Sequence, residues 1–188
     1  MKPRYRSLSA YLRERFHEPV RRIALNAGFS CPNRDGRISA HGCVFCAPES
    51  YGPHAGAKPP PVVHQLRDGI ARGRRRGIRR FIAYFQSYTN TYGPPGLLRD
   101  VYGVIRAFPE IVGLAVGTRP DCVDAGTVAV LSDFVSDYDV WLELGLQSVH
   151  DETLFRLGRG HDSAAFFRAL AAVRSEPRIK VCAHVILG

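Results

Sequence analysis

Short apolar runs alternate with amphipathic stretches along almost the whole chain, and this alternation limits the fold more than any other feature. The runs are typical of buried strands, and the stretches between them repeat apolar residues at helical spacing. The pattern predicts strands over 22–26, 81–85, 112–116, 140–144 and 180–187, and helices over 7–17, 62–76, 95–107, 124–136 and 151–174, the last with a break near 158–160. Nearly continuous apolar strands separated by helices form parallel sheets. We therefore predict an α/β fold of about five strands, either an open doubly wound sheet or a barrel.

Length and composition fit a single domain. The chain has 188 residues, of which 45% are hydrophobic, so it can bury a core. No apolar run approaches the roughly 20 residues that span a bilayer, and the first residues lead into a charged helix rather than a signal sequence. Five cysteines, an odd number with three of them clustered, are untypical of a secreted disulfide framework. We therefore expect a cytoplasmic protein that is not associated with a membrane.

Cys31, Cys43 and Cys46 lie in one stretch rich in glycine and proline, with eleven residues and then two residues between them. Four thiolates close a structural zinc site or an electron-transfer cluster, whereas three leave one metal position open for another ligand. From the spacing alone, three interpretations stay open: an iron–sulfur cluster, a zinc site completed by His41 or His54, and reactive or paired thiols.

Polar segments follow the predicted strands where a parallel sheet would place a binding site. The cysteine loop, residues 28–47, follows the first strand, and residues 86–92, 117–121 and 145–148 follow the next three. Ligands bind at the carboxyl ends of parallel strands, so these loops are expected to converge on one mouth. The basic run 72–80 precedes a strand, so we expect it on the opposite face, as a solvated run rather than a substrate-binding patch.

Several motifs occur together in one order: Cys31-Pro-Asn-Arg-Asp-Gly, Gly42-Cys-Val-Phe-Cys, Phe81-Ile-Ala-Tyr-Phe-Gln-Ser-Tyr-Thr-Asn-Thr-Tyr, Val112-Gly-Leu-Ala-Val-Gly-Thr-Arg-Pro-Asp, Trp141-Leu-Glu-Leu-Gly-Leu-Gln-Ser and Gly158-Arg-Gly-His. Over residues 8–188 the chain resembles the YtqA/YhcC-type radical S-adenosylmethionine (SAM) proteins, which are related to the radical SAM domain of the Elongator catalytic subunit. The resemblance implies a partial parallel (β/α) barrel, a [4Fe–4S] cluster on the three cysteines, and SAM on the open iron. It also implies one radical SAM core domain over 1–188 that ends, truncated, within the barrel.

The resemblance further implies which side chains contact SAM. Gln147 and Arg159 match positions that hold the nucleoside and the methionine carboxylate, and a guanidinium fork suits a carboxylate. Phe45 matches a backbone contact to adenine, although it also fits a core aromatic residue. His184 and Thr118 occupy positions where relatives place ribose-binding acids, and His184 alone fits a satisfied core histidine equally well.

Two further expectations concern side chains outside the cysteine loop. Glu143 lies within an apolar strand and is expected to form an ion pair with a cation such as Arg119, because a buried unpaired carboxylate is costly. Cys122 and Cys182 each stand alone and are expected to be spare thiols.

The resemblance predicts an enzyme that generates a 5′-deoxyadenosyl radical, with modification of the wobble-uridine side chain of tRNA as the expected process. It implies tRNA as a partner and an electron donor such as flavodoxin or ferredoxin. The net charge of +9 fits a polyanionic partner. Two alternatives stay open, which are radical chemistry on a small metabolite and a zinc-stabilised binding module without catalysis.

Overall fold

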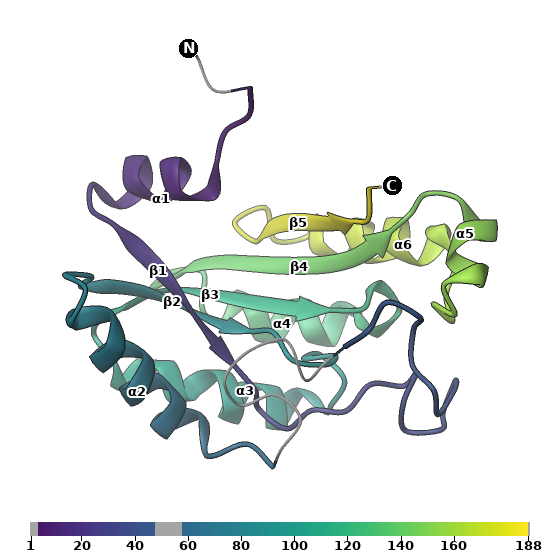
Figure 1. Ribbon diagram of the computed structural model, residues 1–188, viewed down its shortest axis with the longest axis horizontal. Helices are drawn as coiled ribbons and strands as arrows, with labels where there is room; N and C mark the ends of the chain where they lie inside the picture. The colour runs from purple at the N-terminus through teal and green to yellow at the C-terminus, as the bar shows by residue number, and fades with distance from the viewer. Residues whose placement is uncertain (1–3, 48–57, 188) are drawn as a thin grey trace.

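A computed structural model describes residues 4–47 and 58–187. Five strands form one parallel sheet in the order β1-β2-β3-β4-β5, as Figure 1 shows. The strands are β1 (Val20–Leu25), β2 (Arg80–Phe85), β3 (Ile111–Thr118), β4 (Asp139–Gln147) and β5 (Lys180–Val185). The predicted α/β class and the parallel sheet are therefore confirmed.

Helices connect the strands in the predicted order. They are α1 (Leu8–Phe16), α2 (Val62–Arg74), α3 (Pro95–Gly103), α4 (Ala125–Ser132), α5 (Asp151–Arg156) and α6 (Ser163–Val173), with 3₁₀ turns η2 (Val104–Ala107) and η3 (Pro120–Cys122). Ser7, Asp124 and Asp162 cap α1, α4 and α6 by accepting from backbone N–H groups. The helix predicted over 95–107 is α only to Gly103, and the one predicted over 124–136 ends at Ser132. Both differences lie at the ends of helices, where apolar periodicity defines a boundary least well.

The two faces of the sheet are covered unequally. On one face the odd-numbered residues of β2 and the even-numbered residues of β4 pack under α2, α3, α4 and α6 in the main core. On the other face, α1 covers only the amino-terminal part of the sheet, and Leu12 packs against Ile82, Tyr84 and Ala115. Figure 1 shows α1 on the side of the sheet opposite α2 and α3. The carboxyl-terminal part of this second face is thereby left for polar side chains.

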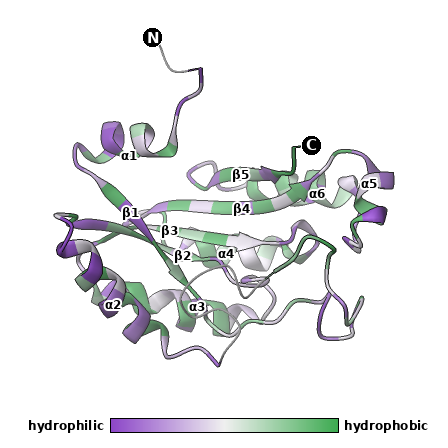
Figure 2. Cartoon of the chain, viewed as in Figure 1, coloured by the Kyte–Doolittle hydropathy of each residue, from purple (hydrophilic) through white to green (hydrophobic). Residues whose placement is uncertain are grey.

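Helix α2 lies close against the sheet because two of its residues have no side chain. A Cβ on Gly69 would lie 2.5 Å from Cγ2 of Ile23, and a Cβ on Gly73 would collide with the ring of Phe81. Figure 2 shows hydrophilic and hydrophobic bands alternating along α2, as expected for a helix with one buried side. The glycines therefore fix the distance of α2 from β1 and β2.

The basic run 72–80 lies at the end of α2 and the start of β2, which is the amino-terminal edge of the sheet. This confirms the predicted placement of the run, away from the carboxyl ends of the strands. Within the part of the chain that the structure describes, no helix is both long and apolar enough to cross a bilayer.

Candidate metal and cofactor site

One cavity lies at the carboxyl ends of the strands and is walled by the cysteine loop. It has a volume of about 270 Å³ and takes residues from β2, β3, β4 and β5. Its lining includes every residue that the sequence assigned to the metal or to SAM: Cys31, Cys43, Cys46, Phe45, Thr118, Gln147, Arg159 and His184. The structure therefore brings these residues to one place, while the role of each stays a prediction.

Backbone hydrogen bonds fold the cysteine loop back on itself. The N–H of Cys46 donates to the carbonyl of Cys43 over 3.0 Å, and the N–H of Gly42 donates to the carbonyl of Asn33 over 2.8 Å. Gly42 has a φ of +79°, in the left-handed region that glycine adopts without strain. These contacts return the long arm after Cys31 to its start, so the three sulfurs line the same cavity.

Cys43 accepts two side-chain hydrogen bonds through its sulfur. The Nδ2 atom of Asn33 lies 3.2 Å from Sγ of Cys43, and Nη1 of Arg159 lies 3.6 Å from the same sulfur. Asn33 and Arg159 are both buried, at 1% and 7% exposure. Hydrogen bonds to a ligand sulfur stabilise its negative charge and tune a bound metal centre. Asn33 was not identified from the sequence, where nothing but its place two residues after Cys31 marks it.

Three arginine side chains in the cavity wall each carry an N–H group that makes no hydrogen bond with a described residue. Arg34 donates from Nη2 to the carbonyl of Cys46, and Arg119 binds Asp121 through two hydrogen bonds. Yet Nε of Arg34, Nη1 of Arg119 and Nε of Arg159 are buried without a hydrogen-bond partner among the described residues. A buried N–H that lacks an acceptor is costly, so the cavity suits a bound group rich in acceptors and negative charge. A SAM carboxylate and the sulfur atoms of an iron–sulfur cluster both meet this requirement.

A single metal ion and a cluster place different demands on the three thiols. Among residues 4–47 and 58–187, no three His, Cys, Asp or Glu side chains gather into a group that could hold one metal ion. A single zinc binds each sulfur at about 2.3 Å and so draws its ligands to one point, whereas a [4Fe–4S] cluster binds each thiolate through a different iron. Of the two histidines considered for zinc, His41 is exposed, and His54 lies outside the described residues.

The residues expected to contact SAM differ in how firmly they are held. Nη2 of Arg159 donates to the carbonyl of Gly145 over 2.8 Å, and its guanidinium lies 6.0 Å from the ring centre of Phe45. A Cβ on Gly145 would lie 2.5 Å from Nη2 of Arg159 and 2.7 Å from Nε2 of Gln147, so this glycine makes room for both. Gln147 has a φ of +68°, which is uncommon outside glycine and occurs often at functional sites.

Two of the remaining expected contacts, Thr118 and His184, already bind neighbouring side chains. Oγ1 of Thr118 lies 2.7 Å from Oγ1 of Thr91, so its hydroxyl is satisfied within the wall. Phe45 is 37% exposed at the cavity and does not belong to the core. His184 is half-exposed and binds Glu143, with 2.9 Å between Nε2 and Oε2.

The ion pair predicted for Glu143 is confirmed, but Arg119, named as an example of its partner, is not the cation. Glu143 pairs with Arg22 from β1 and with His184 from β5, while Arg119 binds Asp121 two residues along the chain. Glu143 lies on the sheet face that carries Arg22 and His184, because alternate residues of a strand point to opposite faces. Arg22 was missed, since nothing in the sequence shows that β1 carries a cation across this face.

Glu143 is a carboxylate held between two cations. Although burial opposes its ionisation, the contacts with His184 and Arg22 lower the pKa of Glu143 below its ordinary value. The Cys182 sulfur and Glu143 raise the pKa of His184 to about 9. Burial and the nearby Glu143 raise the pKa of Tyr84, so its hydroxyl keeps its proton. At neutral pH the Glu143 carboxylate is therefore charged between two cations, and Tyr84 beside it is neutral.

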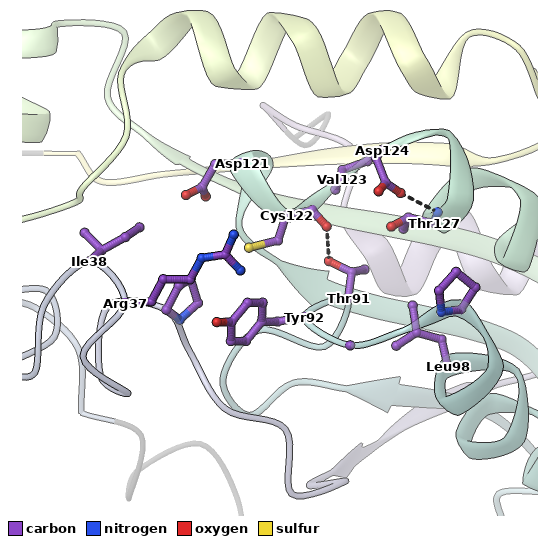
Figure 3. A pocket seen from close by; sticks show the side chains of 13 residues that line it. Arg37, Ile38, Thr91, Tyr92, Leu98, Asp121, Cys122, Val123, Asp124 and Thr127 are labelled. Carbon is purple, nitrogen blue, oxygen red and sulfur yellow. Dashed lines mark hydrogen bonds between the residues drawn. The ribbon is translucent and has the colours of Figure 1, made fainter.

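A larger second cavity, of about 560 Å³, lies beside the cysteine loop and is shown in Figure 3. The Arg37 guanidinium lies 5.7 Å from the ring centre of Tyr92, and Thr91 donates from its hydroxyl to the carbonyl of Cys122. Burial raises the pKa of Cys122 to about 12, so this thiol keeps its proton at neutral pH. Cys122 lines this second cavity and does not line the cavity of the three clustered cysteines.

Comparison with known proteins identifies a family that agrees with the geometry of this cavity. The model of the radical SAM superfamily matches residues 34–188. The chain belongs to the radical SAM superfamily. The matched region includes Cys43, Cys46 and every residue assigned to SAM, and Cys31 lies three positions before it.

Two relatives match nearly all of this chain. Protein YhcC of Escherichia coli (strain K12) is 42% identical over 178 residues, which make up 94% of this chain and 56% of YhcC. Uncharacterized protein YtqA of Bacillus subtilis (strain 168) is 37% identical over 186 residues, which make up 98% of this chain and 58% of YtqA. The chain thus spans a little more than half the length of these relatives.

One solved structure shares the fold at low sequence identity. The archaeal Methanocaldococcus infernus Elp3 superposes with a TM-score of 0.57 and 17% identity, covering 90% of this chain and 38% of Elp3. At this identity the likeness shows the fold alone. The predicted partial radical SAM-type fold is therefore confirmed.

Proposed function

We propose that this chain is the core of a cytoplasmic radical SAM enzyme that modifies the wobble-uridine side chain of tRNA and takes electrons from flavodoxin or ferredoxin. When bound, a [4Fe–4S] cluster and SAM supply a 5′-deoxyadenosyl radical, which takes a hydrogen atom from an unactivated carbon. The observation that carries the enzyme class is the single cavity in which three thiols face three guanidinium groups with unpaired N–H donors.

Different residues of the cavity would bind the cluster and SAM. Cys31, Cys43 and Cys46 would hold the cluster and leave one iron for SAM. Arg159 would bind the methionine carboxylate, because its Nε is buried and lacks a partner while its other nitrogens are anchored to Gly145 and Cys43. A guanidinium anchored in this way is already oriented, so binding a carboxylate costs little further ordering.

Other side chains would orient the nucleoside and keep water out. Phe45 presents a half-exposed ring at the cavity edge, and Gln147 presents its amide beside Arg159. The ion pair of Glu143 with His184 offers polar atoms at the cavity floor that suit ribose hydroxyls. Together these groups would fix the geometry on which hydrogen abstraction depends.

The tRNA substrate is supported by the resemblance of the motifs to the Elongator catalytic subunit and by the fold shared with archaeal Elp3. The most direct test compares tRNA nucleosides by mass spectrometry in cells with the gene, without it, and with a Cys43→Ser allele. We expect one modified uridine to disappear in the last two strains. If tRNA nucleosides are identical in all three, the substrate assignment is wrong, and altered small metabolites in the same cells would favour the metabolite alternative.

The enzyme class has a separate test. Anaerobically reconstituted protein should be brown, with broad visible absorption and about four irons and four sulfides per chain. A colourless protein that retains one zinc would instead support the zinc-stabilised binding module.

A further inference from the structure

The basic run at the end of α2 divides into two groups with different partners. Arg74 forms an ion pair with Glu110, and Arg80 forms one with Glu18. Arg72 and Arg76 have no ion pair with a described residue. The helical turn continues past α2, because the N–H of Arg76 donates to the carbonyl of Gly73 over 2.9 Å. Residues four apart on a helical turn share a face, so Arg72 and Arg76 project together.

A third arginine meets them from the sheet. Arg21 of β1 lines a small groove of about 220 Å³ with Arg72 and Arg76, between α2 and the edge of the sheet. The groove lining contains no carboxylate among the described residues, and Arg22, which also touches it, already pairs with Glu143. Among residues 4–47 and 58–187, β1 pairs with β2 only, so its other edge is open to the groove.

The groove arginines differ from several other exposed arginines of the described chain, which lie next to a carboxylate; Asp68, one turn before Arg72 in α2, does not line the groove and forms no ion pair with a described residue. Ion pairs with a carboxylate are formed by Arg6, Arg15, Arg99, Arg106, Arg156, Arg168 and Arg178, whereas Arg67 and Arg174 are exposed without an ion pair to a described residue. Favourable interaction with the helix dipole explains a cation at the end of α2. It does not explain why Arg21, from another element, joins the same groove.

The geometry points to a site for the phosphodiester backbone of an RNA in the groove of Arg21, Arg72 and Arg76. Guanidinium groups bind phosphate oxygens bidentately. The groove presents three guanidinium groups between α2 and the edge of the sheet, so it suits one phosphate of a longer chain. Arg75 is exposed between Arg74 and Arg76 in the chain, whereas Arg79 lines another groove together with Glu18 and Glu110.

The groove lies far from the cysteine cavity. Strands β1 and β2 are six residues long, which corresponds to about 20 Å between their amino and carboxyl ends. A small substrate in the cavity does not reach the groove, whereas a folded RNA can contact both. The inference does not rest on the proposed reaction, because RNA binding at the groove is measurable without turnover.

The test compares two double variants that remove the same formal charge from the same segment. Arg72→Gln/Arg76→Gln removes the groove arginines, and Arg74→Gln/Arg80→Gln removes the neutralised ones. The affinity of the anaerobically reconstituted chain for a fluorescein-labelled RNA hairpin is measured by fluorescence anisotropy from about 50 to about 200 mM salt. We expect about a tenfold loss of affinity for the first variant at low salt and less than about a threefold loss for the second.

Salt dependence gives a second readout. Loss of two phosphate contacts should reduce the slope of log K against log salt by about 1.4 to 1.8, while the control keeps the wild-type slope. Equal losses in both variants, or none in either, would overturn the proposal, because diffuse charge does not distinguish the two pairs. If Arg72→Gln/Arg76→Gln fails to fold by circular dichroism, Arg21→Gln, at the exposed start of β1, serves instead, with about a threefold loss expected.

Competition identifies the class of ligand. Pyrophosphate should displace the RNA only at high concentration, and polyglutamate of equal charge should compete poorly. Displacement by micromolar pyrophosphate would show a small-anion site instead, and equal competition by polyglutamate would show that the phosphodiester backbone is not recognised. Either result overturns the proposal.

Discussion

The side-chain amide of Asn33 joins the cysteine loop to the turn after α5, because its Nδ2 lies 3.2 Å from Sγ of Cys43 and 2.6 Å from the carbonyl of Gly158. One buried donor therefore touches both a predicted cluster ligand and the segment that carries Arg159. This contact links the electronic environment of the sulfur to the position of the predicted SAM-binding arginine.

Replacing Asn33 with Ala should lower the reduction potential of the reconstituted cluster, because a ligand sulfur without its hydrogen bond is less able to accept added electron density. A contact worth about 1.4 kcal/mol corresponds to about 60 mV for one electron. A redox titration followed by electron paramagnetic resonance measures the shift. Cys122→Ser, in the other cavity, is the control and should leave the potential unchanged; a similar shift in both variants would mean that Asn33 acts only through general destabilisation.

Single Ser substitutions of Cys31, Cys43 and Cys46 should each abolish cluster binding, because a cluster on three thiolates loses a ligand. Iron and sulfide analysis after anaerobic reconstitution measures the content. Cys122→Ser and Cys182→Ser should retain it in full. Loss of the cluster in either of these two would show that the three-ligand assignment is incomplete.

Arg159→Ala should weaken SAM binding by about 1.5 to 3 kcal/mol, the range of a charged hydrogen bond, while the cluster stays in place. Calorimetry on the anaerobic protein measures the affinity. Arg156→Ala provides a matched control, since Arg156 is exposed in the neighbouring helix and pairs only with Glu152 among the described residues. If the two variants bind SAM alike, Arg159 supports the cavity wall and does not contact the ligand.

The ion pair of His184 with Glu143 should make stability depend on pH. The pKa of His184 is raised from 6.5 to about 9, so the stabilisation is complete below about pH 6.5 and is lost as the pH rises through about 9. Because the ring is half-exposed, we expect a loss of about 1 kcal/mol rather than the full value of the shift. Urea unfolding at both ends of this window measures it for the wild type and for His184→Gln. The same pH dependence in both proteins would mean that His184 does not carry the effect.

The order of elements and the convergence of the site could be predicted from the sequence. Apolar runs such as 81–85 are short, continuous and separated by amphipathic stretches, which leaves little choice other than a parallel sheet. Residues as distant as Cys43 and Arg159 then come together because the loops of such a sheet gather at the carboxyl ends of its strands.

Side-chain pairing across the sheet could not be predicted in the same way. The partner of Glu143 depends on which residues of β1 and β5 point to its face, and a shift of one residue would reverse that choice. Arg119 was the nearer candidate in sequence, but Asp121 already binds it through two hydrogen bonds. The separation of the run 72–80 into paired and unpaired arginines could not be predicted for the same reason. Glu18 and Glu110 reach Arg80 and Arg74 only in the folded chain.

The buried glycines Gly69 and Gly73 determine where arginines of α2 lie on the surface. Any larger residue at these positions would push α2 outward and carry Arg72 away from Arg21. A random screen for variants that fail to retain RNA would then recover substitutions of these buried glycines as well as of the exposed arginines. A second measurement, such as the melting temperature, would distinguish a variant in which α2 is displaced from one that has only lost a contact to RNA.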